Sequence, residues 1–261
     1  MGVLDDIVAG VRIDLEERMA HTSLADLEAR LADAPAPRDP MPAFRAPGLA
    51  VIAEVKRKSP SKGALADIPD PAELAAAYET GGAAAISVLT EKRRFGGSLA
   101  DLDAVRARVD IPVQRKEFIV TEYQLVEARA HGADIALLIV AALDDAELRR
   151  LHDLTIELGM VPLVEVHTVE EAERAAHLGA ELIGVNNRNL QTLDVDLAQF
   201  SKLVAHLPED CVKVAESGVT GPEDARRLHD EGAQVLLVGE TLVRHQDPTR
   251  AVEALLRSIP S

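Results

Sequence analysis

The sequence is poor in cysteine, in positive charge and in long apolar runs. Cys211 is the only cysteine among 261 residues, so no intramolecular disulfide can form and no CxxC pair is available for zinc or a redox couple. A formal net charge of −16 argues against a nucleic-acid partner, because such binding depends on Lys and Arg that neutralise phosphates. Any anionic ligand would have to meet a local basic pocket.

Signals for export, membrane insertion and metal binding are also missing. Asp5, Asp6 and Asp14 lie where a signal peptide needs a basic region and an apolar run. No apolar run reaches the roughly 18 residues that predict a membrane span. The 8 histidines form no HxH or HExxH spacing, so we expect no metal site. We therefore expect a cytoplasmic protein with no membrane partner.

The first part of the chain differs in pattern from the rest. Residues 3 to 34 show helical spacing of apolar side chains, and Ser23 is the predicted N-cap of a second helix there. Residues 34 to 48 are rich in proline and lack periodicity, which predicts a connector rather than a folded unit. We expect one barrel domain over 1–261, in which residues 1–48 form a helical extension and connector packed on the barrel.

From residue 49 onward, short runs rich in Val, Ile and Leu alternate with helical patterns, as βα units on a parallel sheet do. Eight such runs occupy residues 49–56, 84–90, 112–118, 134–140, 161–167, 182–188, 211–218 and 235–240. Gly-Ala pairs at Gly82, Gly132, Gly179 and Gly232 recur about every 50 residues and are predicted to mark every second strand. The sequence therefore predicts the α/β class and a (β/α)8 TIM barrel with an extra N-terminal helical segment. A doubly wound sheet could also hold eight strands, but the loops lack its GxGxxG fingerprint.

Polar side chains end five of these runs on the phase that faces the barrel interior. In the first run Glu54 and Lys56 point inward, while the apolar residues between them face the helices. The same phase in the other runs holds Gln114 and Lys116, Glu165 and His167, Asn186 and Arg188, and Glu216 and Gly218. Catalytic groups of this fold lie at the carboxyl ends of strands. The lysines and carboxylates therefore predict acid–base chemistry on a carbon skeleton, with His167 as a supporting or solvated residue.

Phosphate binding has separate signals in three loops. The first loop contains Ser59, Ser61 and Gly63, the seventh strand is followed by Ser217-Gly218, and the eighth is followed by Gly239-Glu240. Glycine lets backbone N–H groups close on an anion. The loops after strands seven and eight are the usual phosphate site of this fold, so we expect a phosphorylated ligand.

With these motifs assembled, the chain resembles the indole-3-glycerol phosphate synthase family of tryptophan biosynthesis. The resemblance runs almost end to end. It rests on IAEVKRKSPSKG, ISVLTE with FGGS, RKEF, ALLIV, LVEVH, IGVNNRNL, VAESGV and LLVGETL, in that order. It implies a monofunctional, cofactor-free carbon-carbon lyase that converts 1-(2-carboxyphenylamino)-1-deoxyribulose 5-phosphate to indole-3-glycerol phosphate, carbon dioxide and water. The implied partner is a small anionic substrate, and we expect a monomer or weak homo-oligomer.

The resemblance also implies roles for individual residues. Lys116 is implied to be the general acid at the substrate ketone, Glu165 to transfer the proton that expels the hydroxyl, and Lys56 to hold the substrate carboxylate. The other catalytic candidates, implied to orient or contact the substrate, are Glu54, Asn186 and Glu216. The implied substrate-binding residues are Ser59, Pro60, Phe95, Phe118, Leu137, Arg188, Leu190, Leu193, Ser217, Gly218, Leu237, Gly239 and Glu240. The division of proton transfer between the two lysines stays open.

The sequence departs from the family at two positions beside Lys116. Glu117 stands where the family usually has Asp, and strand alternation points it away from the cavity. We therefore expect it to affect packing rather than the reaction. Gln114 is less apolar than is typical, and its inward phase predicts a polar group below Lys116.

Two other functions are compatible with parts of the pattern. One is another phosphate-binding barrel such as phosphoribosylanthranilate isomerase, a family that works with a Cys and Asp pair. Cys211 is predicted at the amino end of its strand, which is the wrong face for that chemistry. The other is an inactive barrel kept as a binding module, against which the intact set of inward polar residues argues.

Overall fold

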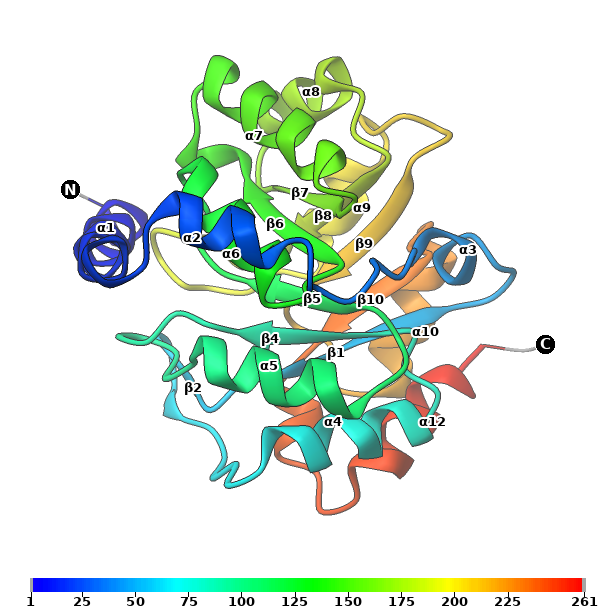
Figure 1. The fold of residues 1–261 in the computed structure, drawn as a ribbon. Coiled ribbons are helices and arrows are strands. Elements are labelled where there is room, and N and C mark those ends of the chain that lie inside the picture. The colour runs from blue at the N-terminus through cyan, green and yellow to red at the C-terminus, as the bar shows by residue number, and fades with distance from the viewer. Residues whose placement is uncertain (1, 260–261) are drawn as a thin grey trace.

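The computed structural model describes residues 2–259, which form a closed barrel of parallel strands (Figure 1). In chain order the strands are β1 (Ala50–Val55), β4 (Ala85–Leu89), β5 (Val113–Lys116), β6 (Ile135–Ile139), β7 (Val161–Val166), β8 (Leu182–Asn186), β9 (Val212–Glu216) and β10 (Val235–Val238). Each barrel strand pairs with its neighbours in the chain, and β10 closes the ring on β1, where Val51 lies opposite Leu236. The predicted (β/α)8 barrel is confirmed, as are the eight predicted strand runs.

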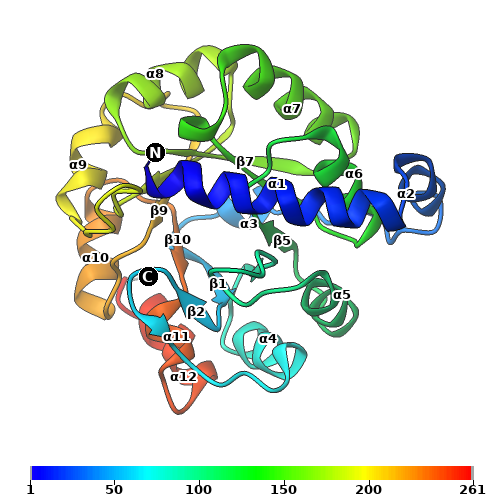
Figure 2. The ribbon, with the colours of Figure 1, turned by 90° about the vertical axis from the view of Figure 1, so that its left-hand side faces the viewer.

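Helices follow the strands and surround the barrel (Figure 2). They are α4 (Pro71–Thr80), α5 (Leu99–Arg108), α6 (Glu122–Ala130), α7 (Asp145–Glu157), α8 (Val169–Leu178), α9 (Ala198–Val204), α10 (Pro222–Asp230), the short α11 (Glu240–Val243) and α12 (Pro248–Leu256), with a 3₁₀ turn η1 (Val140–Ala142) after β6. Several begin at a side chain that accepts a backbone N–H, namely Asp70, Ser98, Asp144, Thr168 and Asp247. These caps satisfy donors that the first helical turn leaves unpaired.

The repeated Gly-Ala pairs lie where the sequence predicts them, between a helix and a strand. Gly82, Gly132, Gly179 and Gly232 have φ angles of 92°, 80°, 83° and 107°, in the left-handed region that glycine adopts at little cost. They precede β4, β6, β8 and β10. The pairs therefore do mark every second strand.

Strand alternation divides the apolar side chains of the barrel into two layers. In β1, Ile52 packs inside the barrel with Leu163 and Val214, whereas Val51 and Val55 pack outside it against the helices. This confirms the predicted phase of the first strand. Apolar side chains fill the interior toward the amino ends of the strands, so polar residues of the same phase collect at the carboxyl ends.

The N-terminal helix α1 (Val3–His21) lies across the carboxyl-end face of the barrel (Figure 2). Its buried residues Ile7 and Val11 join the apolar cluster of the barrel interior. Helix α2 (Leu24–Arg30) follows, and Ser23 accepts a backbone hydrogen bond at its start, as predicted. The N-terminal segment thus contributes apolar side chains to the mouth of the barrel.

The proline-rich segment contains more structure than the sequence predicts. Within residues 34 to 48 the short helix α3 (Met41–Phe44) forms directly after Pro40. Phe44 is fully buried and packs with the first residues of the barrel strands. The expectation of a connector without folded structure is wrong here, because burial of one aromatic ring at the amino end stabilises a turn of helix that periodicity could not reveal.

A buried carboxylate ties the same segment to the barrel. Asp134 Oδ1 accepts from the backbone N–H of Arg38 at 2.8 Å, and its Oδ2 accepts from the backbone N–H of Val113 at 2.8 Å. Arg106 completes the site by donating to Oδ2 at 2.8 Å. Burial raises the pKa of Asp134, whereas these hydrogen-bond donors lower it. The connector is therefore held by a charged group that must stay paired.

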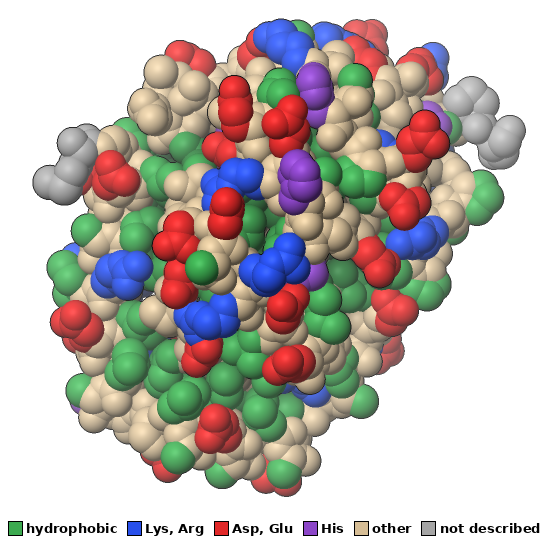
Figure 3. All heavy atoms as spheres, turned by 90° about the horizontal axis from the view of Figure 1, so that it is seen from above, with side chains coloured by type: hydrophobic (Ala, Val, Ile, Leu, Met, Phe, Trp, Pro, Cys, Tyr) green, Lys and Arg blue, Asp and Glu red, His purple; other side chains and the backbone are tan. Residues whose placement is uncertain are grey.

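Charged side chains of both signs lie on the surface, whereas the single thiol is buried. On the face shown in Figure 3, Asp and Glu side chains are interspersed with Lys and Arg, so positive charge on this face is scattered. Among residues 2–259, no helix is long and apolar enough to cross a lipid bilayer. Cys211 is buried and immediately precedes β9, at the amino end predicted for it.

The paired Asp134 leads to a test of stability. We expect Asp134→Asn to lower the free energy of unfolding by about 3–5 kcal/mol, because it leaves the buried guanidinium of Arg106 without a counter-charge. Urea denaturation followed by circular dichroism measures this. The control is Glu253→Gln, which breaks the exposed pair with Arg257 and should cost less than about 1 kcal/mol. Equal effects of the two substitutions would contradict the assignment.

Candidate active site

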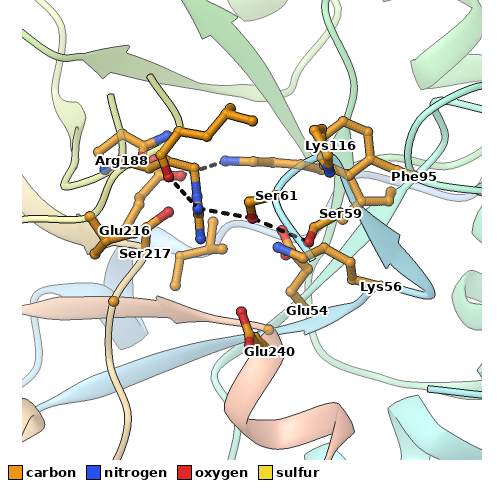
Figure 4. Close-up of a pocket in the computed structure, with 18 of the residues that line it drawn as sticks. Glu54, Lys56, Ser59, Ser61, Phe95, Lys116, Arg188, Glu216, Ser217 and Glu240 are labelled. Carbon is orange, nitrogen blue, oxygen red and sulfur yellow. Dashed lines mark hydrogen bonds and ion pairs between the residues drawn. The ribbon is translucent and has the colours of Figure 1, made fainter. Parts of the chain in front are cut away.

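A cavity of about 490 Å³ opens at the carboxyl ends of the barrel strands (Figure 4). All of the catalytic and substrate-binding candidates that the resemblance implies line it, whereas Gly63 of the first loop does not. They are Glu54, Lys56, Ser59, Pro60, Phe95, Lys116, Phe118, Leu137, Glu165, Asn186, Arg188, Leu190, Leu193, Glu216, Ser217, Gly218, Leu237, Gly239 and Glu240. The structure thus brings the predicted residues together, while their individual roles remain predictions.

Lys116, at the end of β5, lies between two buried carboxylates. Its Nζ donates to Glu165 Oε2 at 3.0 Å and also to Glu216 Oε2. Burial alone would lower the pKa of Lys116, but the charges of Glu165, Glu216 and Glu54 outweigh it and raise that pKa above its ordinary value. Lys116 is therefore protonated and positively charged at neutral pH.

The two carboxylates beside Lys116 titrate in opposite directions. Burial would raise the pKa of Glu165, but the charge of Lys116 and the neighbouring imidazole of His167 hold that pKa well below its usual range. For Glu216, burial raises the pKa more than the charge of Lys116 lowers it. The charge of Glu165 raises it further, to about 8. The surroundings therefore favour the ionised form of Glu165 and the protonated form of Glu216, and such a separation of pKa values is typical of acid–base catalysts.

Two glycines leave room for the carboxylates of the site. A Cβ at Gly184 in β8 would lie 2.1 Å from Glu216 Oε1, and a Cβ at Gly239 after β10 would lie 2.5 Å from Glu54 Oε1. Both distances are shorter than real Cβ contacts allow. Glycine at these two positions therefore leaves the space that the carboxylates of Glu216 and Glu54 occupy.

A second lysine and carboxylate pair lies at the end of β1. Lys56 Nζ donates to Glu54 Oε1 at 2.9 Å, and Ser87 Oγ lies 3.5 Å from Glu54 Oε2. In Figure 4 both labelled side chains point into the cavity. On the opposite side, Asn186 Oδ1 accepts from the backbone N–H of Arg188 at 3.0 Å. These contacts fix the orientation of the groups that surround the space in front of Lys116.

His167 supports Glu165 from behind. Its Nε2 lies 3.3 Å from Glu165 Oε1, and its Nδ1 lies 3.2 Å from Glu171 Oε2. Burial would lower the pKa of His167, but the two carboxylates raise it to about 9. His167 lies outside the set of cavity-lining residues and contacts Glu165 instead, so its supporting role stays a prediction.

One wall of the cavity is apolar. The rings of Phe95 and Phe118 lie 6.1 Å apart between centroids, at an interplanar angle of 39°. Leu137 and Leu190 continue this wall, and Ile7 of α1 adds to it. Ile7 was missed as a site residue, because helical periodicity predicts which side of α1 is buried but not what it is buried against.

The loops after β9 and β10 form the other side. Ser217 and Gly218 have φ angles of 65° and 90°, so the chain turns sharply at the end of β9. Thr241 Oγ1 donates to the carbonyl of Val219 at 2.5 Å and so joins this loop to the start of α11. The two predicted phosphate loops are therefore held side by side.

The loop after β1 folds over the mouth as a hairpin of β2 (Lys58–Ser59) and β3 (Gly63–Ala64). Arg188 Nη1 donates to Ser61 Oγ at 3.0 Å, a contact drawn in Figure 4. Lys62, at the tip of the hairpin, also lines the cavity and was not among the predicted site residues. Its position directly after the Ser-Pro-Ser segment of the first loop could have indicated that it belongs to the site.

The two departures from the family pattern lie on opposite sides of β5. Glu117 borders the cavity, but its carboxylate accepts from Thr90 Oγ1 at 2.9 Å and lies 3.9 Å from Arg115. Burial raises its pKa. Gln114 is fully buried on the interior phase, below Lys116, and its amide atoms have no hydrogen-bond partner among the described residues. Glu117 therefore belongs to outer packing and Gln114 to the base of the site.

The cavity lies at the carboxyl ends of a (β/α)8 barrel, is partly apolar, and is faced by acid and base groups with separated pKa values. These features are those of an enzyme that carries out acid–base chemistry on a small molecule. Within residues 2–259 no cluster of His, Cys, Asp and Glu could hold a metal ion. The sequence profile of the family described as Indole-3-glycerol phosphate synthase matches residues 4–255. The chain belongs to this family.

Individual relatives agree with the family profile. A protein of Nocardioides sp. named indole-3-glycerol phosphate synthase is 66% identical over 255 residues, which covers 98% of both chains. One from Streptomyces coelicolor, named indole-3-glycerol phosphate synthase 1, is 60% identical and covers 98% of this chain and 95% of its own. The crystal structure of 3-hexulose-6-phosphate synthase from Salmonella typhimurium aligns with a TM-score of 0.65 over 80% of this chain and 98% of its own, at 13% identity. That likeness supports the barrel fold alone.

The contact between Gly184 and Glu216 gives a first test of the site. We expect Gly184→Ala to lower kcat/KM at least about 100-fold, because the added methyl group displaces the carboxylate of Glu216 by more than about 1 Å. Steady-state kinetics and a crystal structure of the variant measure both effects. Gly221→Ala is the matched control, since a Cβ at Gly221 meets nothing within 4 Å. Activity of Gly184→Ala close to that of the control would refute the idea.

The raised pKa of His167 predicts a pH dependence of stability. Because the pKa of His167 is higher in the folded protein than in the unfolded chain, its protonation stabilises the fold. This contribution is fully present below the unfolded pKa of about 6.5 and is lost as the pH rises through the folded pKa of about 9. The free energy of unfolding of the wild type minus that of His167→Gln should therefore fall by about 3 kcal/mol across this range. Denaturant titrations between pH 5.5 and pH 9.5, at about one-unit steps, measure it. A difference that stays constant with pH would rule out the charged imidazole.

Proposed function

We propose that this chain closes the indole pyrrole ring of its family's reaction, converting 1-(2-carboxyphenylamino)-1-deoxyribulose 5-phosphate to indole-3-glycerol phosphate, carbon dioxide and water. Family membership makes it a carboxy-lyase of tryptophan biosynthesis. The observation that carries the proposal for the site is the position of Lys116, charged and held between Glu165 and Glu216 at the edge of the apolar wall. A charged donor there faces the space in which a substrate ketone would lie.

The first step forms the carbon-carbon bond. The ring carbon that bears the carboxylate attacks the ketone carbon, and Lys116 donates a proton to the ketone oxygen as negative charge develops there. Lys56 holds the substrate carboxylate until it leaves as carbon dioxide, and Glu54 fixes Lys56 through their 2.9 Å contact. The apolar wall that includes Phe95, Phe118 and Leu190 accommodates the flat anthranilate ring.

The second step expels the hydroxyl as water: the C–O bond breaks as the hydroxyl takes up a proton, and the neighbouring methylene carbon loses a proton, so that the double bond of the pyrrole ring forms. Glu165 serves in this proton transfer, and His167 behind it stabilises the ionised carboxylate before the proton arrives. Glu216 contacts the anilino nitrogen or a nearby hydroxyl, and its pKa of about 8 supports a role as hydrogen-bond donor at neutral pH. Asn186 orients the intermediate as a neutral donor.

The remaining cavity residues bind the two ends of the substrate. Around the phosphate lie the backbone groups of the loops after β9 and β10 and the hydroxyl of Ser59. The residues proposed for direct substrate contact are Ser59, Pro60, Leu137, Arg188, Leu193, Ser217, Gly218, Leu237 and Gly239, all of which line the cavity. We further propose a cytoplasmic monomer or weak homo-oligomer without a nucleic-acid partner, which the formal charge of −16 supports.

The assigned proton transfers can be tested directly. We expect Lys116→Ala and Glu165→Gln each to lower the rate of ring closure at least about 1,000-fold, because each removes a group that moves a proton in the reaction. The appearance of indole fluorescence measures the rate, and the chain itself has no Trp to obscure it. Thermal unfolding of both variants checks that the barrel is intact. Turnover within about tenfold of wild type in either variant, a loss under roughly 1.4 kcal/mol, would remove that residue from the mechanism.

A further inference from the structure

An ion pair spans the mouth of the cavity beside the loops proposed to bind phosphate. Lys62, in the hairpin after β1, donates from Nζ to Glu240 Oε1 at 2.6 Å. Both side chains line the cavity, and Glu240 directly follows Gly239. In Figure 4 Glu240 projects from the start of α11 toward the cavity. The pair therefore joins the hairpin to the phosphate side of the mouth.

A carboxylate at this place opposes the binding of a phosphate. Burial would raise the pKa of Glu240, but the hydrogen bond and charge of Lys62 hold that pKa below its usual range, so Glu240 is ionised at neutral pH. An ionised carboxylate accepts hydrogen bonds and donates none, and it repels a second anion. Direct contact between Glu240 and a phosphate would therefore be unfavourable, although the sequence places Glu240 among the substrate-binding residues.

The ion pair between Lys62 and Glu240 is weak enough for a phosphate to replace Glu240 as the partner of Lys62. The side chain of Lys62 is 51% exposed and that of Glu240 is 24% exposed, and ion pairs so open to water contribute little stability. A phosphate monoester carries close to two negative charges at neutral pH and offers three acceptor oxygens, so it competes well for a lysine. Arg244, whose Nη1 lies 3.6 Å from Glu240 Oε1, still screens the carboxylate after the lysine leaves.

Other basic side chains of the mouth are engaged elsewhere. Lys56 is bound to Glu54, and Arg188 donates both to Ser61 Oγ and to the carbonyl of Leu193. Lys62 is held by a partner that a phosphate can displace, and its flexible stem reaches the phosphate side of the cavity.

We infer that Lys62 binds the phosphate group of the substrate and that Glu240 acts by holding Lys62 at the mouth until the phosphate takes it over. The inference rests on the proposed function for the identity of the phosphorylated ligand. Lys62 raises the affinity of the site for phosphate, and Glu240 lowers that affinity by competing for the same ammonium group. Glu240 is thus a positioning residue rather than a phosphate ligand.

The test measures phosphate affinity in Lys62→Gln, Glu240→Gln and the double variant. Inorganic phosphate is the probe, and its dissociation constant is obtained by ³¹P NMR titration, which does not depend on turnover. We expect Lys62→Gln to weaken phosphate binding about tenfold, because it removes the cation and leaves Glu240 facing the anion. Glu240→Gln should strengthen binding about threefold, and the double variant should lie between the two single variants.

Steady-state kinetics separate a binding role from a merely structural one. Lys62→Gln should raise KM by about the same factor as the phosphate dissociation constant, with kcat within about twofold of wild type, since the phosphate lies away from the reacting atoms. Lys62→Arg, which restores the positive charge, should recover most of the affinity.

Matched controls exclude general effects of net charge. Lys213→Gln removes a lysine at the amino end of the barrel, where Nζ donates to the carbonyls of Glu209 and Cys211. Glu253→Gln removes a carboxylate from an i,i+4 pair with Arg257 on α12. Both should leave the phosphate dissociation constant within about twofold of wild type.

Three results would overturn the inference: phosphate affinity in Lys62→Gln within about twofold of wild type, weaker binding in Glu240→Gln, or a wild-type protein that does not bind phosphate. A different result defeats the proposed function. If the wild type binds phosphate with the expected pattern among the variants but forms no indole-3-glycerol phosphate, the phosphate site stands and the assigned reaction does not.

Discussion

A lysine cannot be buried in a barrel without partners, and the site is organised around this constraint. Lys116 is surrounded by carboxylates from three other strands, which offset the cost of removing its charge from water. That arrangement leaves an excess of negative charge, which raises the pKa of Glu216 and is offset at Glu165 by His167 behind it. The glycines at 184 and 239 are part of the same solution, because each leaves space for a carboxylate.

The sequence carries most of the information needed for the fold. Short runs rich in Val, Ile and Leu predict the eight strands, period-2 alternation predicts the inward phase of Glu54, and the Gly-Ala pairs predict where every second strand begins. These features are local: a glycine with positive φ and an alternating strand leave their mark on neighbouring residues. Because the carboxyl ends of parallel strands meet at one mouth, a correct strand phase also predicts which polar side chains share a cavity.

Features that depend on contact between distant segments could not be predicted in this way. Phe44 occupies the amino end of the barrel from a segment without periodicity. Ile7 enters the cavity from α1, which also contacts η1, more than a hundred residues later in the chain. Lys62 forms an ion pair with Glu240, which lies 178 positions later in the chain. The opposite pKa shifts of Glu165 and Glu216 also depend on geometry, since both are glutamates at equivalent strand ends.

The N-terminal segment touches both ends of the barrel, and this has a consequence for biosynthesis. Helix α1 docks at one end through Ile7, while the backbone of Arg38 reaches Asp134, 96 positions later, at the other. A ribosome makes the chain from its amino terminus, so these segments emerge well before the strands on which they dock. Until β6 has been synthesised, the apolar stripe of α1 and the ring of Phe44 have no surface to cover them. The growing chain therefore exposes these groups until residue 139, about half of these 261 residues, has been added.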